Sequence, residues 1–468
     1  MQNHAQKKGS ITLIVLVFGA IFFAVLVALS GYVLAQNRLE DVTRVKAEAF
    51  SIAEAGLEYY RWHLAHFPND LTNGTGGPGP YAVPIPDPSG GTAGTASLAI
   101  TANTACNQTT SIDIASTGTA ADDPSVPQTL VAKYARPSVA EYSYIVNDSV
   151  WAGSDRIING PYHSNGGIRM DGTANAPVTS SVSSWTCDSS FGCSPSQTVP
   201  GVFGSGPNQN LWSYPTPQVD FAGIAANFAS LKTTAQASGI YLPRYSSGNN
   251  NSSAYHKGYH LIFNADGTVT VNRVSSATKL PVTPLNSTDP NYDYALIGNE
   301  TAYNTYTIPA TCGLIFVEDN TWIEGTIPAK VTVVVADVTD TSVTPDAFLE
   351  GNIAYASANG TDGFTLISAH NILIAPNAPS IMTLNGIFIA QGGAFGMNLY
   401  ACPGTYEPKS SLAILGSTVS DKRTGTKWGS SCGYLSRTDS LDRNLVADPP
   451  PFTPVTSNQF QFVDWREE

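Results

Sequence analysis

The chain has 468 residues and a formal net charge of −13, and only 13% of its residues are charged. It exceeds the roughly 250–300 residues at which a single hydrophobic core stops growing, so more than one structural unit is expected. The acidic balance argues against nucleic acid as a partner, since phosphates would be repelled. The 41 glycines and 31 prolines indicate a turn-rich β protein after the first helix.

The first predicted element is a long helix over residues 10–67, which begins with an uncharged, mostly apolar stretch. No charged residue occurs between Ser10 and Asn37, and about 20 apolar residues cross a bilayer as a helix. Lys7 and Lys8 precede the stretch. Under the positive-inside rule they leave the N-terminus in the cytoplasm and the remainder of the chain outside. The side chains expected to face lipid or other helices are Ile11, Leu13, Ile14, Leu16, Phe18, Phe22, Phe23, Leu26, Leu29, Tyr32 and Leu34.

Beyond the apolar stretch the helix is predicted to continue as an amphipathic helix. Apolar residues recur there at intervals of three, four and once five positions, and no proline occurs before Pro68. These residues are Leu39, Val42, Val45, Ala49, Ile52, Leu57, Tyr60 and Leu64. A secretory signal peptide cut near Ala28 is the alternative, but it would have a shorter apolar region. A helix of about 85 Å needs other protein or lipid to pack against. A single-pass membrane anchor with a helical stalk would show the same sequence of an apolar and then an amphipathic stretch.

The N-terminal sequence resembles that of type IV prepilins. Gly9 follows two lysines and precedes Ser10 and the apolar helix, and residues 49–57 read Ala-Phe-Ser-Ile-Ala-Glu-Ala-Gly-Leu. The latter segment is similar to the end of the N-terminal helix in PilX-type minor pilins and K-type minor pseudopilins. The resemblance implies that prepilin peptidase cuts between Gly9 and Ser10 and that the new amine is methylated. It also implies that the helix passes from the cytoplasmic membrane into a cell-surface filament, where it packs against other pilin subunits.

Two positions depart from the family pattern. Most pilins carry a glutamate as the fifth mature residue, where it neutralises the N-terminal amine of a neighbouring subunit, whereas this chain has Ile14. In K-type pseudopilins the same absence accompanies a place at the filament tip, so the resemblance implies a tip or priming position. Gly31 stands where many major pilins have a helix-loosening proline, and glycine lowers helix propensity by about 1 kcal/mol.

Downstream of the helix the pattern changes to short strands. Residues 68–95 are rich in Gly, Pro and Asn and are predicted to be a linker. Alternating runs over residues 96–140 predict a small β region. Residues 141–309 are predicted to form a further β region with an inserted helix at 218–237 and a hairpin at 258–273, the latter because Asp266-Gly267 is a strong turn signal.

The last segment, residues 310–468, contains short apolar strands separated by Gly and Asn corners and ends in a C-terminal tail. This pattern favours a β-solenoid or parallel β-helix, with its first rungs near Tyr142, and a β-sandwich is the alternative. The predicted fold class is therefore α+β, with a long pilin-like helix followed by a mostly β head. The tract also resembles the large exported domains found behind PilX-type N-termini.

Six cysteines in a chain expected outside the cytoplasm favour disulfides. Cys187 and Cys193 bracket a short loop, and Cys402 and Cys432 bracket a Gly- and Ser-rich excursion, so these are the candidate pairs. Whether Cys106 pairs with Cys312 stays open, because Cys312 would also suit a buried thiol. No Cys-x-x-Cys pair occurs, which argues against a structural zinc site.

We find no convincing catalytic set in the sequence. His256 and His260 are four residues apart, but no third metal ligand is evident. His163 beside Ser164 is interpreted as a turn at a strand corner. The sequence therefore predicts a structural subunit with no cofactor, metal or enzymatic activity. A membrane-anchored surface adhesin or glycan-binding protein is the alternative. A polysaccharide lyase or hydrolase would need a cluster of charged side chains on one face of the β domain.

Overall fold

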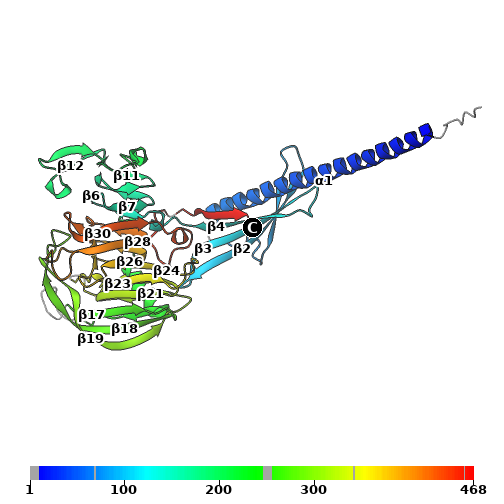
Figure 1. Ribbon diagram of the computed structural model, residues 1–468. Helices are drawn as coiled ribbons and strands as arrows, with labels where there is room; N and C mark the ends of the chain where they lie inside the picture. The colour runs from blue at the N-terminus through cyan, green and yellow to red at the C-terminus, as the bar shows by residue number, and fades with distance from the viewer. Residues whose placement is uncertain (1–9, 68–69, 246–255, 341–342, 458, 468) are drawn as a thin grey trace, which may run out of the picture. The chain divides into compact units, whose positions relative to one another are not determined.

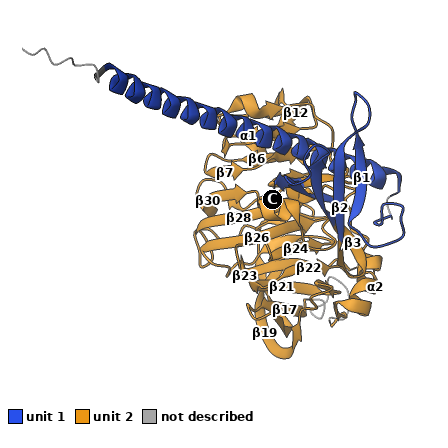
Figure 2. Ribbon diagram, turned by 90° about the vertical axis from the view of Figure 1, so that its right-hand side faces the viewer, with its two compact units in different colours: residues 1–101, 112–134, 464–468 blue, residues 102–111, 135–463 orange. Residues whose placement is uncertain are grey.

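The computed structural model describes residues 10–67, 70–245, 256–340, 343–457 and 459–467. These residues show a long N-terminal helix followed by a mostly β chain, which is the predicted α+β class. The chain divides into two compact units (Figure 2). Unit 1 comprises Met1–Thr101, Ile112–Tyr134 and Asp464–Glu468, and unit 2 comprises Ala102–Ser111 and Ala135–Val463.

Unit 1 is built on the helix α1 and a five-stranded sheet. Helix α1 runs without interruption over Ser10–His66, within one residue of its predicted end, and Gly31 does not break it. The sheet has the order β1-β2-β3-β4-β31. Its strands are β1 (Tyr81–Pro86), β2 (Thr92–Ala105), β3 (Gln108–Ala120), β4 (Gln128–Ala135) and β31 (Gln461–Glu467).

The second half of α1 packs against this sheet through the predicted apolar stripe. The stripe is buried from Val45 to Leu64, whereas Leu39 and Val42 are 66% and 48% exposed. Small residues let the helix approach closely: a Cβ atom added to Gly118 on β3 would lie 2.0 Å from the carbonyl oxygen of Ala49. A Cβ added to Gly56 would lie 2.6 Å from that of Ala96 on β2. The Ala-Glu-Ala-Gly segment is thus the place where helix and sheet meet.

A polar cluster fixes the chain just after α1. His63 Nε2 lies 3.0 Å from Asp70 Oδ2, and His63 is buried. The backbone N–H of Thr72 donates to Asp70 Oδ1 over 2.8 Å. Hydrogen bonds from Thr72, and also from Gly74 and His63, lower the pKa of Asp70 to about 2. The acceptor is therefore ionised at all physiological pH values.

The predicted linker over residues 68–95 is partly wrong, because it contains β1 and the start of β2. Tyr81 and Val83 alternate with exposed residues and are buried. Prolines 84 and 86 signalled a linker in the sequence. They are tolerated here because β1 is an edge strand, where a missing N–H leaves no ladder bond unmade.

Unit 2 is dominated by parallel ladders that stack strand upon strand (Figure 1). One ladder pairs ten strands in succession, each parallel to the next. In order they are β16 (Ile240–Leu242), β20 (Leu314–Val317), β22 (Lys330–Val335), β24 (Gly363–Ser368), β26 (Ile381–Ala390), β28 (Lys409–Ser420), β5 (Tyr144–Val146), β8 (Tyr162–Ser164), β11 (Val178–Ser180) and β15 (Trp212–Ser213). A sandwich would be built from antiparallel sheets.

Further parallel ladders flank the first. One runs through β17, β21, β23, β25 and β27, a second through β28, β30, β7 and β10, and a third through β6, β9 and β14. Their bounds are β17 (Gly258–Phe263), β21 (Asn320–Ile327), β23 (Ala347–Tyr355), β25 (Ile372–Ile374), β27 (Phe395–Gly396), β30 (Cys432–Ser440), β7 (Arg156–Asn159), β10 (Thr173–Ala174), β6 (Val150–Ala152), β9 (Ile168–Met170) and β14 (Val202–Phe203). Between the ladders lies a core of buried Val, Ile, Leu and Phe side chains.

The stacking order differs from the chain order. Strand β5 was expected among the first rungs, yet it pairs with β28, and β7 pairs with β30. Residues 144–180 therefore continue the stack beyond the strands of residues 409–440. Each of these short strands is apolar on its buried face and polar at its corners. The sequence pattern therefore predicts a strand of the stack but not the strand with which it pairs.

The remaining elements are short helices and antiparallel strands. The antiparallel strands are β12 (Ser184–Cys187), β13 (Gln197–Pro200), β18 (Thr268–Pro281), β19 (Tyr292–Thr307) and β29 (Lys427–Trp428). The helices are η1 (Val139–Glu141), η2 (Ser189–Phe191), η3 (Gln209–Leu211), α2 (Phe228–Ser238) and α3 (Arg443–Ala447).

Two of these elements differ in extent from the sequence prediction. The inserted helix, predicted at 218–237, begins only at Phe228, because the side chain of Asn227 accepts a hydrogen bond from the Ser230 N–H and caps it there. The hairpin predicted at 258–273 turns at Asp266-Gly267, where Gly267 has φ 91°. Its second strand, β18, runs on to Pro281 and pairs with β19, which the prediction lacked.

Replacing Gly118 with alanine is predicted to loosen α1 from its sheet. The added methyl group would meet backbone atoms of Ala49 and Ala53, which cannot rotate away, and overpacking of this kind costs about 1–3 kcal/mol. Hydrogen exchange of residues 45–64, measured by mass spectrometry on the full chain, should become faster by about tenfold.

Gly77→Ala is the matched control, since no atom lies within 4 Å of its added Cβ. Equal exchange protection in the two variants would contradict this account of helix packing.

Candidate functional site

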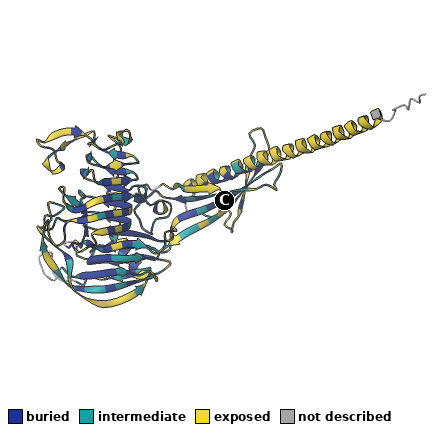
Figure 3. Ribbon diagram, viewed as in Figure 1, coloured by how far each residue is buried: buried dark blue, intermediate teal, exposed yellow. Residues whose placement is uncertain are grey.

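The first half of α1 is an apolar surface that the chain leaves uncovered (Figure 3). Its predicted lipid- or helix-facing side chains are exposed, from 45% at Leu26 to 74% at Ile11. By length and composition the helix can cross a membrane. Ser10 is the first residue of α1, and Gly9 lies outside the described residues. An apolar surface of this size is covered by lipid or protein when the molecule functions.

The structure joins the six cysteines in three disulfides, Cys106–Cys312, Cys187–Cys193 and Cys402–Cys432. The second and third are the pairs that the sequence favoured. The first pairs Cys106, which lies in the turn between β2 and β3, with Cys312. Cys312 is therefore not a free thiol. All three disulfides lie within unit 2, and this is consistent with an oxidising compartment.

An open polar groove, about 800 Å³ in volume, crosses the strands β19, β21 and β23 of unit 2. Three glutamates line it, Glu300 from β19, Glu324 from β21 and Glu350 from β23, together with His260 from β17. His260 is 5% exposed, and its Nδ1 lies 2.9 Å from Glu300 Oε2. Its Nε2 lies 3.4 Å from Glu324 Oε1, which is a charge contact rather than a well-formed hydrogen bond.

The surroundings shift the pKa values of these groups in different directions. Burial raises the pKa of Glu350, whereas the charge contact with His260 lowers the pKa of Glu324 despite partial burial. Burial opposes protonation of His260, but the contacts with Glu324 and Glu300 outweigh it and raise its pKa. The sequence did not indicate this glutamate groove, because the residues are far apart in the chain. Glu324 and Glu350 follow Ile323 and Leu349, which are aligned in neighbouring strands, but this alignment arises only from strand pairing.

A second polar cluster surrounds a cavity of about 140 Å³. His370 Nδ1 lies 2.8 Å from Asp346 Oδ1, and its Nε2 lies 3.9 Å from Asp289 Oδ1. Asp293 accepts hydrogen bonds from Tyr400 at 2.7 Å and Asn398 at 2.9 Å. These contacts form a satisfied network that ties residues 289–293 to the parallel strands, so we assign it a structural role.

The histidines singled out in the sequence lie in different surroundings within unit 2. His256 stacks on Tyr294 and lines the second cluster, whereas His260 lies in the glutamate groove, so the two do not share a metal. His163 contacts Thr179 and Asn165, and Ser164 donates its hydroxyl to the carbonyl of Asp148. Within the described residues there is no group of three or more His, Cys, Asp or Glu side chains that could hold a metal ion.

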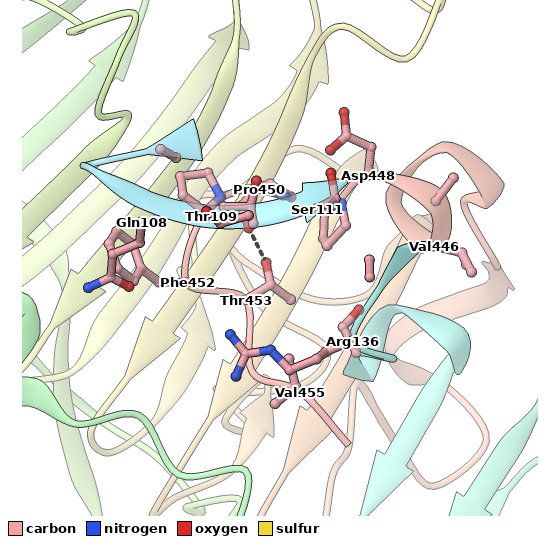
Figure 4. A pocket seen from close by; sticks show the side chains of 17 residues that line it. Gln108, Thr109, Ser111, Arg136, Val446, Asp448, Pro450, Phe452, Thr453 and Val455 are labelled. Carbon is pink, nitrogen blue, oxygen red and sulfur yellow. Dashed lines mark hydrogen bonds between the residues drawn. The ribbon is translucent and has the colours of Figure 1, made fainter. Parts of the chain in front are cut away.

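A third, smaller cavity of about 130 Å³ lies beside the Pro449-Pro450-Pro451-Phe452 segment (Figure 4). Thr453 donates to the carbonyl of Pro450 over 2.8 Å, and Thr332 donates to the carbonyl of Pro451. The proline segment thus lies across the strands β22 and β24 and is held there by hydrogen bonds. Arg136 and Asp448 both line this cavity, and Asp448 forms an ion pair with Lys330.

Comparison with known proteins gives little guidance. No family model matches the chain, and no curated protein matches it. Among solved structures, the chain is similar to the crystal structure of competence-associated pilin ComZ from Thermus thermophilus, with 12% identity and a TM-score of 0.33 over 91% of this chain and 97% of that chain. A TM-score this low does not establish a common fold.

The contact between His370 and its two aspartates predicts a pH-dependent stability. Although burial opposes it, the charges of Asp346 and Asp289 raise the pKa of His370 to about 8, from an ordinary 6.5. A raised folded-state pKa stabilises the protein below pH 6.5, and this contribution is lost as the pH rises through about 8. The free energy of unfolding should fall across this window by at most about 2 kcal/mol.

Asp346→Asn should flatten that slope, because the amide carries no charge, while His66→Asn, at an exposed position of α1, should leave it unchanged. Chemical denaturation at pH 6 and pH 9 measures both. An Asp346→Asn variant with the wild-type slope would show that His370 does not carry the effect.

Proposed function

We propose that this protein is a minor pilin- or pseudopilin-like structural subunit of a type IV filament, with no enzymatic activity. Prepilin peptidase cuts it after Gly9, and the amine of Ser10 is methylated. Before assembly α1 spans the cytoplasmic membrane with its N-terminus on the cytoplasmic side. The helix then leaves the membrane for the filament, where it packs against other pilin subunits, and the β domain is displayed at the cell surface.

One observation carries this proposal: the uncovered part of α1 is longer than a bilayer can cover. From Ile11 to Arg44 every residue is exposed, a length of about 50 Å at 1.5 Å per residue. The hydrocarbon core of a bilayer is about 30 Å thick. Leu39 and Val42 therefore lie beyond the hydrocarbon core when the N-terminal stretch spans the membrane, and apolar side chains there favour a protein neighbour.

The same helix supplies the mechanism of assembly. Its first half is apolar on all sides, as suits a position among other helices in a filament core. Its second half is fixed to the sheet of unit 1 and connects that core to the rest of the chain. Ile14 is exposed and apolar, so it offers no carboxylate for the amine of a neighbouring subunit. This supports a tip or priming position rather than a repeating one.

We further interpret the parallel ladders of unit 2 as the faces of a β-solenoid-like head. A stack of this kind is extended by adding strands, and its length does not constrain the sequence of α1. A domain that is independent of α1 in this way suits display outside the filament core. The second candidate function is an adhesin or glycan-binding protein held by an uncleaved single-pass anchor. It is favoured only if α1 stays in the membrane.

The two candidates predict different mature N-termini. Under the filament proposal, mass spectrometry of protein recovered from sheared surface filaments should give an N-terminal peptide that begins at Ser10. Recovery of intact Met1 from assembled filaments would refute the proposal.

Gly9→Leu provides a matched genetic test, because a bulky residue at the cleavage position should block processing. Incorporation into filaments should then fall to background, while the protein still accumulates in the membrane. Ile11→Leu is the control, since it preserves apolar character one residue beyond the cut. Unchanged surface display of the Gly9→Leu variant would favour the anchored adhesin.

A further inference from the structure

The glutamate groove of unit 2 contains two buried polar atoms that lack hydrogen-bond partners. His260 Nε2 and Glu350 Oε2 are both shielded from solvent, and neither makes a hydrogen bond, although His260 Nε2 lies 3.4 Å from Glu324 Oε1 in a charge contact. Their sister atoms are satisfied: His260 Nδ1 contacts Glu300, and Glu350 Oε1 accepts from the amide of Asn377. Buried polar atoms are rarely left unpaired in proteins, so each such atom calls for an explanation.

The hydrogen-bonding character of the groove follows from these contacts. An ionised carboxylate accepts only, so Nδ1 of His260 must be the donor to Glu300. In the neutral imidazole this leaves Nε2 as an acceptor. Glu324 and Glu350 add further acceptor oxygens. The three carboxylates therefore present acceptors, and they leave the groove with net negative charge even when His260 is protonated.

A ligand that satisfies this set must supply several donors and positive charge. We propose that the glutamate groove binds the guanidinium group of an arginine on a partner protein. A guanidinium offers five N–H donors in a planar fork and accepts none, and it pairs with two carboxylates at once more readily than an ammonium does. The open groove admits a side chain from outside.

The position of the groove fits a docking function. Its walls come from the successive parallel strands β21 and β23 and from β19 of the neighbouring antiparallel pair. Close packing fixes the carboxylates: a Cβ atom added to Gly351 would lie 2.1 Å from Glu324 Oε2. The strands thus hold the acceptors in place before a ligand arrives, which lowers the entropic cost of binding. This inference does not depend on the filament role proposed above.

Binding should also depend on pH in a defined direction. Protonation of His260 would turn Nε2 into a donor and add a positive charge, which opposes a cationic ligand. The contacts with Glu324 and Glu300 raise the pKa of His260 above 6.5 against the effect of burial. The other titratable groups that face it are Glu300 from β19, Glu324 from β21 and Glu350 from β23. Their protonation also weakens binding, so affinity should fall as the pH is lowered.

The experiment uses the full chain in detergent and the peptide Ac-Gly-Arg-Gly-Arg-Gly-NH₂ as probe. Isothermal titration at pH 8 should show binding of this peptide and none of the citrulline analogue, which keeps the shape but loses the charge. Glu324→Gln and Glu350→Gln should each weaken binding by about tenfold, because a charged hydrogen bond is lost.

Glu58→Gln is the charge-matched control, since Glu58 is exposed on α1 in unit 1 and is not among the residues that line the groove. It should bind the peptide as the wild type does, and thermal unfolding verifies that all variants are folded. Equal binding of the arginine and citrulline peptides would overturn the proposal, and so would wild-type affinity in both groove variants. Equal affinity for the same peptide with both arginines replaced by lysine would overturn the guanidinium assignment. Binding of a chitosan oligosaccharide in place of the arginine peptide would overturn the assignment of a protein partner.

Discussion

The structure depends on an apolar helix surface that the chain itself does not bury. From Ile11 to Val42 the apolar side chains of α1 are exposed, whereas the apolar stripe from Val45 to Leu64 is buried against the sheet of unit 1. The free energy of burying one large apolar side chain is about 1.5–3 kcal/mol, so leaving this surface in water is strongly unfavourable. The helix must therefore reside in lipid or among other helices, and this constraint determines where the protein works.

The boundary between the two halves of α1 is set by residue size as much as by hydrophobicity. Ala49, Ala53 and Gly56 lie where the helix contacts β2 and β3, and Gly118 faces them from β3. Small residues on both sides let the backbones approach, which locks the second half of the helix in place. The first half carries large apolar residues with no partner in the chain. One continuous helix is thus packed into unit 1 through its second half and contacts the surroundings of the protein through its first half.

The sequence predicted α1 almost to the residue because its signals are local: hydrophobicity, helical periodicity and a proline at the end. It also predicted the hairpin at Asp266-Gly267, a turn that depends on two adjacent residues. It failed at β1 and α2, where local residues decide the outcome, and at strand pairing, where distant residues decide it. Strand β1 was hidden by its prolines, α2 was shortened by the cap at Asn227, and β5 pairs with β28 across some 270 residues of chain. The glutamate groove was invisible for the same reason, because Glu300, Glu324 and Glu350 become neighbours only through strand pairing.

The central claim is that the exposed segment of α1 beyond the membrane contacts protein. A photo-crosslinking residue placed at Val42 in cells tests it most directly, with Glu54, which is exposed on the packed half, as the comparison position. The account predicts adducts at Val42 with other small proteins that begin with an apolar helix. Adducts with lipid alone, or no protein adduct at Val42, would contradict it.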